Sequence, residues 1–358
     1  VIGLANTIIT PLYLLFQSSL QARQEALHYS INTFSNFLVQ VGLAILLIVV
    51  FRMGALGSLL ANVITSLIFF IYVLIMYVPK IKMGIDKKIA KEAFAYSLPL
   101  LPHQISLWSA GALDRLFLNG YKGKAATGIY SVGQQFGSVV GNIAYSVNQA
   151  FVPWFYQMVE TGKDGWRKIE KMGLFAVIGY SLIAFVISFF APEILRVMVS
   201  EKFRDAWQIM PLLNFAYVYH GVYFFFINIL FLKDTGHVFV VTLSAMVIDV
   251  VLNILLVPIW GVWGCGVAFF STYFGRAVIA LILSRRKNKD IQYNFMVMFS
   301  VPILFLALSF TTWFFVGMPF FESLFIKLAV CGVLLLLFYL KYKETIKILA
   351  LQFKSRKK

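Results

Sequence analysis

The chain has 358 residues, of which 60% are hydrophobic and 13% are charged, against about 25% charged residues in soluble domains. Together with a mean hydropathy of +0.83, this composition excludes a soluble globular protein and predicts an all-α integral membrane protein. The net charge of +16 would indicate nucleic-acid binding in a soluble chain, but here the placement of the basic residues favours a membrane interpretation.

Eleven apolar segments, each close to the ~20 residues that a bilayer core requires, predict membrane-spanning helices. In chain order these spans are expected at 1–20, 31–50, 57–78, 97–118, 129–157, 172–192, 207–231, 237–257, 262–283, 295–316 and 324–340. Loops therefore alternate between the two sides of the membrane. One set of loops holds 22 of the 31 Lys and Arg residues and the opposite set holds 6.

The positive-inside rule places the basic set of loops in the cytoplasm. This set comprises 17–30, 80–91, 160–171, 233–236, 284–294 and the tail from residue 341. We therefore expect the C-terminus in the cytoplasm, with the basic tail against anionic phospholipid of the inner leaflet. A tail that binds RNA is the less favoured alternative, and we predict no nucleic-acid partner.

Two short motifs suggest an internal repeat. Residues 54–61 read GALGSLLA and residues 261–268 read GVWGCGVA, so both follow the pattern G-x-x-G-x-x-x-A at an offset of 207 residues. Each follows a short loop on the outer side, and the same offset aligns the second and third spans with the eighth and ninth. Parallel repeats of this kind build transporters from two related halves. Because the second half has six spans, we expect about three further helices before the first residue.

This organisation divides the chain into four parts. They are the remainder of an N-terminal lobe (1–79), a cytoplasmic linker (80–96), a six-helix C-terminal lobe (97–284), and two extra transmembrane helices with the basic tail (285–358). In the linker, Ile81, Ile85 and Ile89 recur every four positions, which is the spacing of an amphipathic helix at a membrane interface.

Polar side chains recur at helical spacing on several spans. The fifth span carries Gln135, Ser138, Asn142, Tyr145 and Gln149; the first carries Asn6, Thr10, Tyr13 and Gln17; the second carries Asn32, Asn36 and Gln40; the fourth carries His103, Ser106 and Asp114; the seventh carries Asn214, Tyr217 and Asn228. Such rows can be explained by interhelical hydrogen bonds or by a water-filled cavity. Their recurrence on successive helices favours a cavity, and amides, hydroxyls and aromatic rings suit a sugar.

Charged residues within the spans need partners. Asp114 and Arg115 diverge by roughly 100° on their helix, so each requires a partner of its own. Asp249 and Arg276 are expected about 18 Å and about 12 Å above the cytoplasmic edge, where they form either a structural salt bridge or separate sites. In the second case Arg276 joins Arg115 in attracting an anionic group, for which the planar guanidinium is well suited.

Other basic groups are weaker candidates for the same cavity. Lys122, Lys124 and His103 could add positive character, and His220 could add a titratable group, although a lone histidine is more often simply packed. The two cysteines, Cys265 and Cys331, are expected to be small core residues. The sequence has no nucleotide-binding loop, no His or Cys cluster and no large outer loop, so we expect no enzyme, metal or cofactor.

Residues 97–140, SLPLLPHQISLWSAGALDRLFLNGYKGKAATGIYSVGQQFGSVV, resemble the start of the second half of the polysaccharide transporters. These are the Wzx-like oligosaccharide flippases of the MOP (multidrug/oligosaccharidyl-lipid/polysaccharide) superfamily. The residues that carry the resemblance are Pro99, Asp114, Arg115, Gly128, Tyr130 and Ser131. It extends over essentially the whole chain, including the segment GCGVAFFSTYFGRAV.

The resemblance implies a MOP-type bundle of two six-helix lobes around a central cavity, of which about 11 of 14 transmembrane helices are present. It implies export of undecaprenyl-diphosphate-linked oligosaccharide across the bacterial cytoplasmic membrane, by alternating access, for O-antigen, capsule or exopolysaccharide synthesis. Glycosyltransferases and a polysaccharide polymerase are then possible partners. The expected cavity residues are Arg115, Arg276, Asp114, His103, Gln135, Asn142, Gln149, Asn36 and Gln17, with Asp249 as a possible ion-coupling residue.

One hypothesis assigns the adjacent charges: Arg115 contacts the anionic cargo, and Asp114 orders the short outer loop through Lys122 or Lys124. Two alternatives stay open. A cation-coupled multidrug antiporter of the same superfamily would need a buried carboxylate, for which Asp249 is the candidate. A membrane polymerase or ligase would need a large outer loop, and the longest expected one, 193–206, has only fourteen residues.

Overall fold

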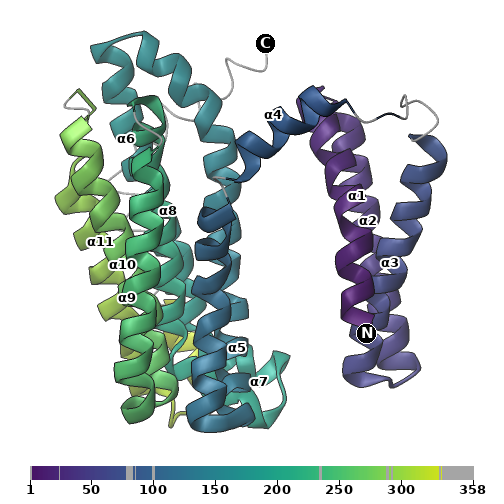
Figure 1. The fold of residues 1–358 in the computed structure, drawn as a ribbon. Coiled ribbons are helices and arrows are strands. Elements are labelled where there is room, and N and C mark those ends of the chain that lie inside the picture. Colours follow the sequence, from purple (N-terminus) through teal and green to yellow (C-terminus); the bar gives the residue numbers. More distant parts are fainter. Residues whose placement is uncertain are drawn as a thin grey trace. The chain divides into compact units, whose positions relative to one another are not determined.

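The computed structural model describes residues 2–23, 25–77, 84, 86–98, 101–233, 236–287, 290–291, 293–329 and 332. Throughout these ranges the regular elements are helices, as the composition predicted. The chain forms two compact units, Val1–Phe94 and Ala95–Lys358, which are taken in turn below (Figure 1).

The first unit is a bundle of three long helices. They are α1 (Ile2–Ala22), α2 (Ala26–Ile45) with the π-helical turn η1 (Leu46–Val50), and α3 (Gly54–Met76). Both α1 and α2 pack against α3, and the buried side chains of Phe16, Leu20 and Val73 form their common core. Most other large apolar side chains of these helices point outward, as expected for helices that face lipid.

Polar residues of the first unit bond across the helices. Gln17 is only 7% exposed, and its Nε2 donates to Tyr13 Oη at 2.5 Å and to Thr33 Oγ1 at 3.3 Å. Tyr13 in turn donates to the carbonyl of Asn32 at 3.2 Å. Gln17 thus makes one hydrogen bond between helices, and its role in a cavity stays a prediction. Asn36, the other candidate of this unit, is half-buried on α2.

The helix α4 (Lys87–Ser97) follows α3 along the chain and spans the boundary between the two units. Its cationic residues lie beside exposed apolar side chains, including Ile89 at 65% and Phe94 at 72% exposure. The structure thus places a short amphipathic helix in the expected linker. Ile81 and Ile85, which also belonged to the predicted apolar row, lie outside the described residues.

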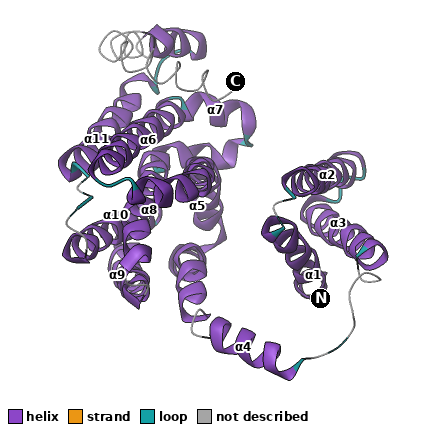
Figure 2. Ribbon diagram, turned by 90° about the horizontal axis from the view of Figure 1, so that it is seen from above, coloured by secondary structure: helices purple, strands orange, loops and turns teal. Residues whose placement is uncertain are grey.

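The second unit is built around α8 (Met210–Lys233), which packs against helices on several sides (Figure 2). The remaining elements are α5 (Leu101–Glu160), α6 (Lys163–Phe189), α7 (Ala191–Met198), η4 (Glu201–Gln208), α9 (Gly236–Trp260), α10 (Val262–Lys287), α11 (Phe295–Ser309) and η5 (Phe310–Phe315). A further helix covers residues 320–329. A helix that is apolar on nearly all faces, as α8 is, is stable only when other helices cover it.

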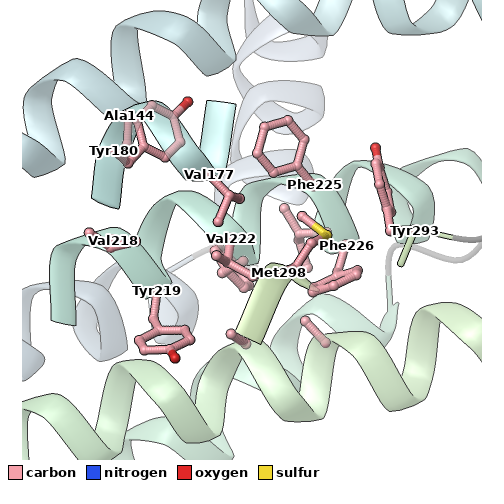
Figure 3. Close-up of a cluster of buried hydrophobic side chains, with 14 of the residues drawn as sticks. Ala144, Val177, Tyr180, Val218, Tyr219, Val222, Phe225, Phe226, Tyr293 and Met298 are labelled. Atoms are coloured by element: carbon pink, nitrogen blue, oxygen red, sulfur yellow. The ribbon is translucent and has the colours of Figure 1, made fainter. Parts of the chain in front are cut away.

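Aromatic and branched side chains of α8 form the main core. They pack against Val177 and Tyr180 of α6, Ala144 of α5 and Met298 of α11 (Figure 3). Tyr219 is buried as well, and its hydroxyl donates to the carbonyl of Phe299 at 2.9 Å. This core fixes the orientation of α8. It therefore determines which residues of α8 lie on the opposite face of the helix.

Two expected outer loops are helical instead. The predicted loop 119–127 lies within α5, which is interrupted only at Gly123, where φ is +82°. Lys122, Lys124, Ala125 and Ala126 are good helix formers, and one glycine in the left-handed region suffices to turn the chain. The predicted loop 193–206 consists mostly of α7 and η4, with Pro192 in the first helical turn, where proline is favoured.

The two motifs of the proposed repeat have the same local geometry. Gly54 and Gly261 both adopt positive φ, at +56° and +57°. Three residues later, a Cβ atom at Gly57 or Gly264 would lie 3.0 Å or 2.3 Å from a backbone oxygen of the preceding helical segment. Each motif therefore turns the chain and lets two consecutive helices approach closely. The repeat of whole six-helix halves stays a prediction.

Seven helices of the described chain are long and apolar enough to cross a membrane. They are Leu27–Ile48, Leu56–Met76, Lys163–Phe189, Met210–Leu232, Val238–Trp260, Val262–Lys287 and Phe295–Phe315. The protein is thus a multi-pass membrane protein. The count of about eleven spans stays a prediction, and the basic tail and Cys331 lie outside the described residues. Cys265 is buried, as expected.

A buried ion pair fixes the helix 320–329 to the rest of the second unit. Lys327 is fully buried, and its Nζ donates to Glu193 Oε2, to Thr312 Oγ1 and to the carbonyl of Phe189, each at 2.9 Å. Ser323 donates to the other oxygen of Glu193 at 2.6 Å. The charge of Lys327 is thereby neutralised within the protein, which explains how a lysine is tolerated in a predicted span.

We expect Lys327→Met to destabilise the protein by about 3–5 kcal/mol, because it strands the buried carboxylate of Glu193. Denaturant unfolding of the purified full-length protein measures this change. The double substitution Lys327→Met with Glu193→Gln leaves no unpaired charge and should restore most of the loss. An unfolding midpoint that the single substitution leaves unchanged would show that the ion pair contributes little.

Candidate functional site

The two adjacent charges of α5 point to different places. Asp114 is fully buried, whereas the side chain of Arg115 is exposed at the surface of the second unit. This divergence follows from the helical rotation of about 100° per residue. Each residue has its own partners, as the sequence predicted, and the two sets of partners define two neighbouring sites.

Arg115 lies in an open cavity of about 290 Å³. Its Nε and Nη2 donate to Gln134 Oε1 on the returning arm of α5, at 3.1 and 2.5 Å. Gln134 is 4% exposed, so these hydrogen bonds anchor the guanidinium to a buried side chain. The cavity is lined by Gly111, Ala112, Arg115, Gln134, Gln135, Ser138 and Tyr217. It therefore combines one cation with amide, hydroxyl and aromatic groups.

The ring of Tyr217 reaches this wall because α5 has glycines opposite it. A Cβ atom would lie 3.0 Å from the ring at Gly137 and 2.5 Å from it at Gly141. Any side chain at Gly141 would therefore displace the ring. The two helices can approach closely here, and Tyr217 forms the floor of the cavity between them.

A polar and aromatic strip continues along α5 and α8 from the cavity. Asn142, Tyr145 and Gln149 of α5 are exposed, and Gln149 Nε2 donates to the hydroxyl of Tyr145 at 2.6 Å. On α8, His220 and Phe224 are half-buried beside them, and the rings of Tyr145 and Phe224 lie 6.4 Å apart. Unlike the polar row of α1, in which Gln17 is buried, this row is exposed on the surface of the second unit.

Asp114 belongs to a second, buried site between α5, α9 and α10. Tyr130 Oη donates to Asp114 Oδ2 at 2.6 Å, and Asn253 Nδ2 donates to Asp114 Oδ1 at 2.7 Å. Asn253 Nδ2 also lies 3.3 Å from Asp249 Oδ1, which accepts a hydrogen bond from Thr272 Oγ1 at 3.1 Å. We refer to Asp114, Tyr130, Asp249, Asn253 and Thr272 as the carboxylate cluster.

The carboxylate cluster contains two acids and no basic side chain. Asp114 and Asp249 are both fully buried, and Asn253 Nδ2 lies between them, 2.7 Å from Asp114 Oδ1 and 3.3 Å from Asp249 Oδ1. Within the described chain, Asp249 Oδ2 and Asn253 Oδ1 are enclosed and accept no hydrogen bond. Two adjacent buried carboxylates need either a shared proton, which neutralises one of them, or a bound cation that offsets their charge. The cluster can therefore hold one positive charge.

Comparison with known proteins identifies the family. A family model described as "Polysaccharide biosynthesis protein" matches residues 4–208, which is more than half of the chain. The chain belongs to this family. The match confirms the resemblance to polysaccharide transporters that residues 97–140 carry.

Two curated proteins are similar to this chain. Lsg locus putative protein 1 of Haemophilus influenzae is 26% identical over 108 residues, which cover 30% of this chain and 27% of that protein. The uncharacterized membrane protein MJ1068 of Methanocaldococcus jannaschii is 22% identical over 226 residues, which cover 61% and 43%. The chain spans less than half the length of these relatives.

Two solved transporter structures share the fold. The structure of the lipid II flippase MurJ in an inward closed conformation matches 86% of this chain and 67% of its own, with a TM-score of 0.66 and 13% identity. A mutant of the Vibrio cholerae MATE transporter VcmN matches 81% and 69%, with a TM-score of 0.56 and 17% identity. At these identities the likeness establishes the fold.

The structure corrects one predicted contact of the charged residues and decides between two alternatives for another pair. Asp114 contacts neither Lys122 nor Lys124: it lies two turns away from Lys122 along α5 and points into the carboxylate cluster. Of the two alternatives for Asp249 and Arg276, the structure shows separate sites: Asp249 accepts a hydrogen bond from Thr272 Oγ1 at 3.1 Å, while the guanidinium of Arg276 lies 3.9 Å from the centroid of the Tyr223 ring.

The remaining candidates fall into three groups. Arg115 and Gln135 line the cavity, and Asn142 and Gln149 continue the strip. Gln17 and Asn36 belong to the first unit. His103 lies on α5, but its side chain lies outside the described part of the structure.

Sequence reasoning missed the hydrogen-bond donors of the carboxylate cluster. Asn253 follows Asp249 by one helical turn, and Thr272 precedes Arg276 by one turn, so both share the helical face of a charge that the sequence did single out. Tyr130 appeared only as part of the family resemblance. A search for polar residues one turn from each intramembrane charge would have found Asn253 and Thr272.

Proposed function

We propose that the full-length protein moves undecaprenyl-diphosphate-linked oligosaccharide across the bacterial cytoplasmic membrane by alternating access, for O-antigen, capsule or exopolysaccharide synthesis. The cavity at Arg115 carries this proposal. Membership of the polysaccharide biosynthesis family and a fold shared with a lipid II flippase support it.

The cavity offers the chemistry that such a cargo requires. Gln134 accepts hydrogen bonds from Nε and Nη2 along one edge of the Arg115 guanidinium, and Nη1 has no hydrogen-bond partner among the described residues. These donors suit phosphate or carboxylate oxygens. Gln135, Ser138 and Tyr217 add amide, hydroxyl and aromatic surfaces, which match the hydroxyls and the apolar faces of sugars.

The carboxylate cluster is the proposed site of ion coupling, with Asp249 joined by Asp114. Oxygen-rich sites with carboxylate, amide and hydroxyl ligands suit a hard cation such as Na⁺, and a proton shared by the two acids would serve the same purpose. An ion gradient is the proposed source of energy for uphill transport.

The same cluster favours a second candidate function, a cation-coupled multidrug antiporter. A buried carboxylate is the feature that this alternative required, and the fold is shared with a MATE transporter as well. The cavity distinguishes the two: an exposed arginine beside amides suits an anionic, sugar-bearing cargo better than the cationic drugs that such antiporters carry.

The membrane orientation is also a proposal. The basic loops and the tail from residue 341 would face the cytoplasm, where anionic phospholipid attracts them. The exposed lysines and apolar residues of α4 suit the same interface. Glycosyltransferases and a polymerase that act on the two sides of the membrane are the proposed functional partners.

Deletion of the full-length gene tests the proposal. We expect surface polymer to disappear and single lipid-linked repeat units to accumulate on the cytoplasmic leaflet, where mass spectrometry of extracted lipids identifies the glycan. Normal surface polymer with reduced tolerance of drugs or dyes would contradict the flippase and favour the antiporter.

A further inference from the structure

Two hydrogen bonds cross the hairpin of α5 side by side. Asp114 and Arg115 are consecutive residues of its outgoing arm. Tyr130 and Gln134 lie one helical turn apart, on the same face of its returning arm. Tyr130 Oη donates to Asp114 Oδ2 at 2.6 Å. Arg115 Nε and Nη2 donate to Gln134 Oε1 at 3.1 and 2.5 Å. The first bond belongs to the carboxylate cluster and the second to the cavity, so one hairpin joins the two sites.

The strength of the bond from Tyr130 depends on the charge of Asp114. A hydrogen bond to an ionised carboxylate is roughly twice as strong as one between neutral groups. Tyr130 is fully buried, so its hydroxyl answers to the cluster and not to solvent. A cation that binds the Asp114 carboxylate offsets its charge and uses the same oxygens. Cation binding therefore weakens the bond between the two arms.

The bond to Gln134 competes with an anionic cargo for Arg115. It occupies Nε and Nη2, an edge of the guanidinium that can form a two-pronged fork with a phosphate or a carboxylate. Gln134 is buried, and a Cβ atom at Gly111 of the outgoing arm would lie 3.8 Å from its Nε2. The amide of Gln134 is thus confined between the arms, and its release from Arg115 requires the arms to shift.

The returning arm is suited to transmit such a shift. Tyr130 and Gln134 belong to one continuous helical stretch, which moves as a unit. Gly123, at φ +82°, is the turn about which it can pivot. On the other side, the ring of Phe269 of α10 lies 6.4 Å from that of Tyr130 and 5.5 Å from that of Tyr217 in the cavity. The cluster and the cavity thus share two sets of contacts, and both include Tyr130.

We propose that Tyr130 is a positioning residue that couples the carboxylate cluster to the cavity. Cation binding at Asp114 releases the hydroxyl of Tyr130, the returning arm shifts, and Gln134 frees the edge of Arg115 for an anionic group of the cargo. The inference rests on the proposed function and adds the sign of the coupling: the cation raises the affinity for the cargo. By reciprocity, the cargo raises the affinity for the cation by the same factor.

Probe binding with and without sodium measures this coupling. Labelled inorganic pyrophosphate is a soluble probe of the diphosphate, and equilibrium dialysis against the purified full-length protein gives its affinity in NaCl or in choline chloride. At equal concentrations the two salts screen the charge of Arg115 equally. We expect Na⁺ to raise the affinity of the wild type by about fivefold or more, the lower end of the coupling between sites in proteins.

Tyr130→Phe removes the hydroxyl and keeps the ring beside Phe269. The bond between the arms is then absent with or without Na⁺. We therefore expect this variant to bind pyrophosphate in choline chloride as tightly as the wild type does in NaCl, with no further gain from Na⁺. The matched control is Tyr219→Phe, which removes another buried hydroxyl, bonded to the carbonyl of Phe299 at 2.9 Å. It should keep the wild-type response to Na⁺.

Two further variants separate the cluster from the hairpin. Asp249→Asn removes a carboxylate of the cluster and leaves the bond from Tyr130 to Asp114, so in both salts it should bind as the wild type does in choline chloride. Gln134→Met removes the acceptor that holds Arg115, so its affinity should not respond to Na⁺. This variant also serves if Tyr130→Phe fails to fold, and a wild-type response to Na⁺ would then contradict the coupling.

A wild-type response to Na⁺ in Tyr130→Phe would overturn the inference, because the cation would then act without this hydroxyl. Reduced affinity of this variant in both salts would also overturn it, since that result indicates a structural role alone. The inference fails as well if the wild type binds no pyrophosphate or binds it equally in both salts. The gene deletion tests the proposed function separately. Normal surface polymer in the deletion strain, with a sodium response that Tyr130→Phe abolishes, would refute the flippase and leave the coupling standing.

Discussion

Arg115→Gln in the full-length protein abolishes polymer export while the protein still reaches the membrane at wild-type amounts. The substitution removes the only cation that lines the described cavity but keeps a side chain that can bond to Gln134. Because charge-assisted hydrogen bonds to an anionic cargo are lost, we expect a fall in export of at least about tenfold. Surface polymer, quantified in a complemented deletion strain, measures the effect.

The matched control for this prediction is Arg167→Gln. Arg167 is exposed on α6, away from the residues that line the cavity, so the same loss of charge should leave export unchanged. Arg115→Lys keeps a charge without the fork and should give an intermediate level. Wild-type export by Arg115→Gln would refute the assignment of the cavity as the cargo site.

Asp249→Asn and Asp114→Asn make transport independent of the ion gradient. Asparagine has almost the same shape as aspartate, so the hydrogen bonds from Thr272 and Tyr130 can persist. Each substitution removes one of the two carboxylates. The remaining carboxylate no longer shares a proton or Na⁺ with a second one, so the cation loses its binding site. We expect the gradient-driven part of transport to vanish in proteoliposomes with an imposed pH or Na⁺ gradient.

Asp205→Asn provides the control for the two cluster variants. Asp205 is an exposed carboxylate of η4 in the same unit, and its substitution should leave the gradient dependence intact. Comparison of pH and Na⁺ gradients also tells which cation the cluster binds. A wild-type protein that ignores both gradients, or cluster variants that respond as the wild type does, would rule out coupling at this site.

The sequence was sufficient to predict that Asp114 and Arg115 have separate partners, because helical rotation alone requires it. It was insufficient to predict the partners themselves. Asn253, which donates to Asp114, lies 139 positions further along the chain, and only the packing of α9 against α5 brings the two together. Local spacing carries no information about such contacts.

The two alternatives left open for Asp249 and Arg276, a salt bridge or separate sites, show a related limit. Counting residues from the membrane edge gives the depth of a side chain but not its direction around the helix axis. Asp249 accepts a hydrogen bond from Thr272 of α10, whereas Arg276 stacks on Tyr223 of α8. Two charges at similar depth on consecutive helices can therefore face different neighbours.

Polar rows on α1 and α5 have nearly the same spacing but different environments. Gln17 bonds to Thr33 inside its bundle, whereas Asn142 and Gln149 are exposed. Such a row joins helices by hydrogen bonds where a neighbouring helix supplies partners, and it lines a cavity where none does. The spacing of the row does not distinguish the two cases. The helical course of residues 119–127 was missed for a similar reason: hydropathy marks the end of an apolar stretch and not the end of a helix.

Reconstitution tests the central claim most directly. The full-length protein, in liposomes that contain the lipid-linked oligosaccharide extracted from the deletion strain, should transfer this lipid between leaflets, where an added glycosidase can reach the sugar. The account predicts rapid transfer by the wild type and at least about tenfold slower transfer by Arg115→Gln. Transfer at equal rates by both proteins, or no faster than in protein-free liposomes, would contradict it.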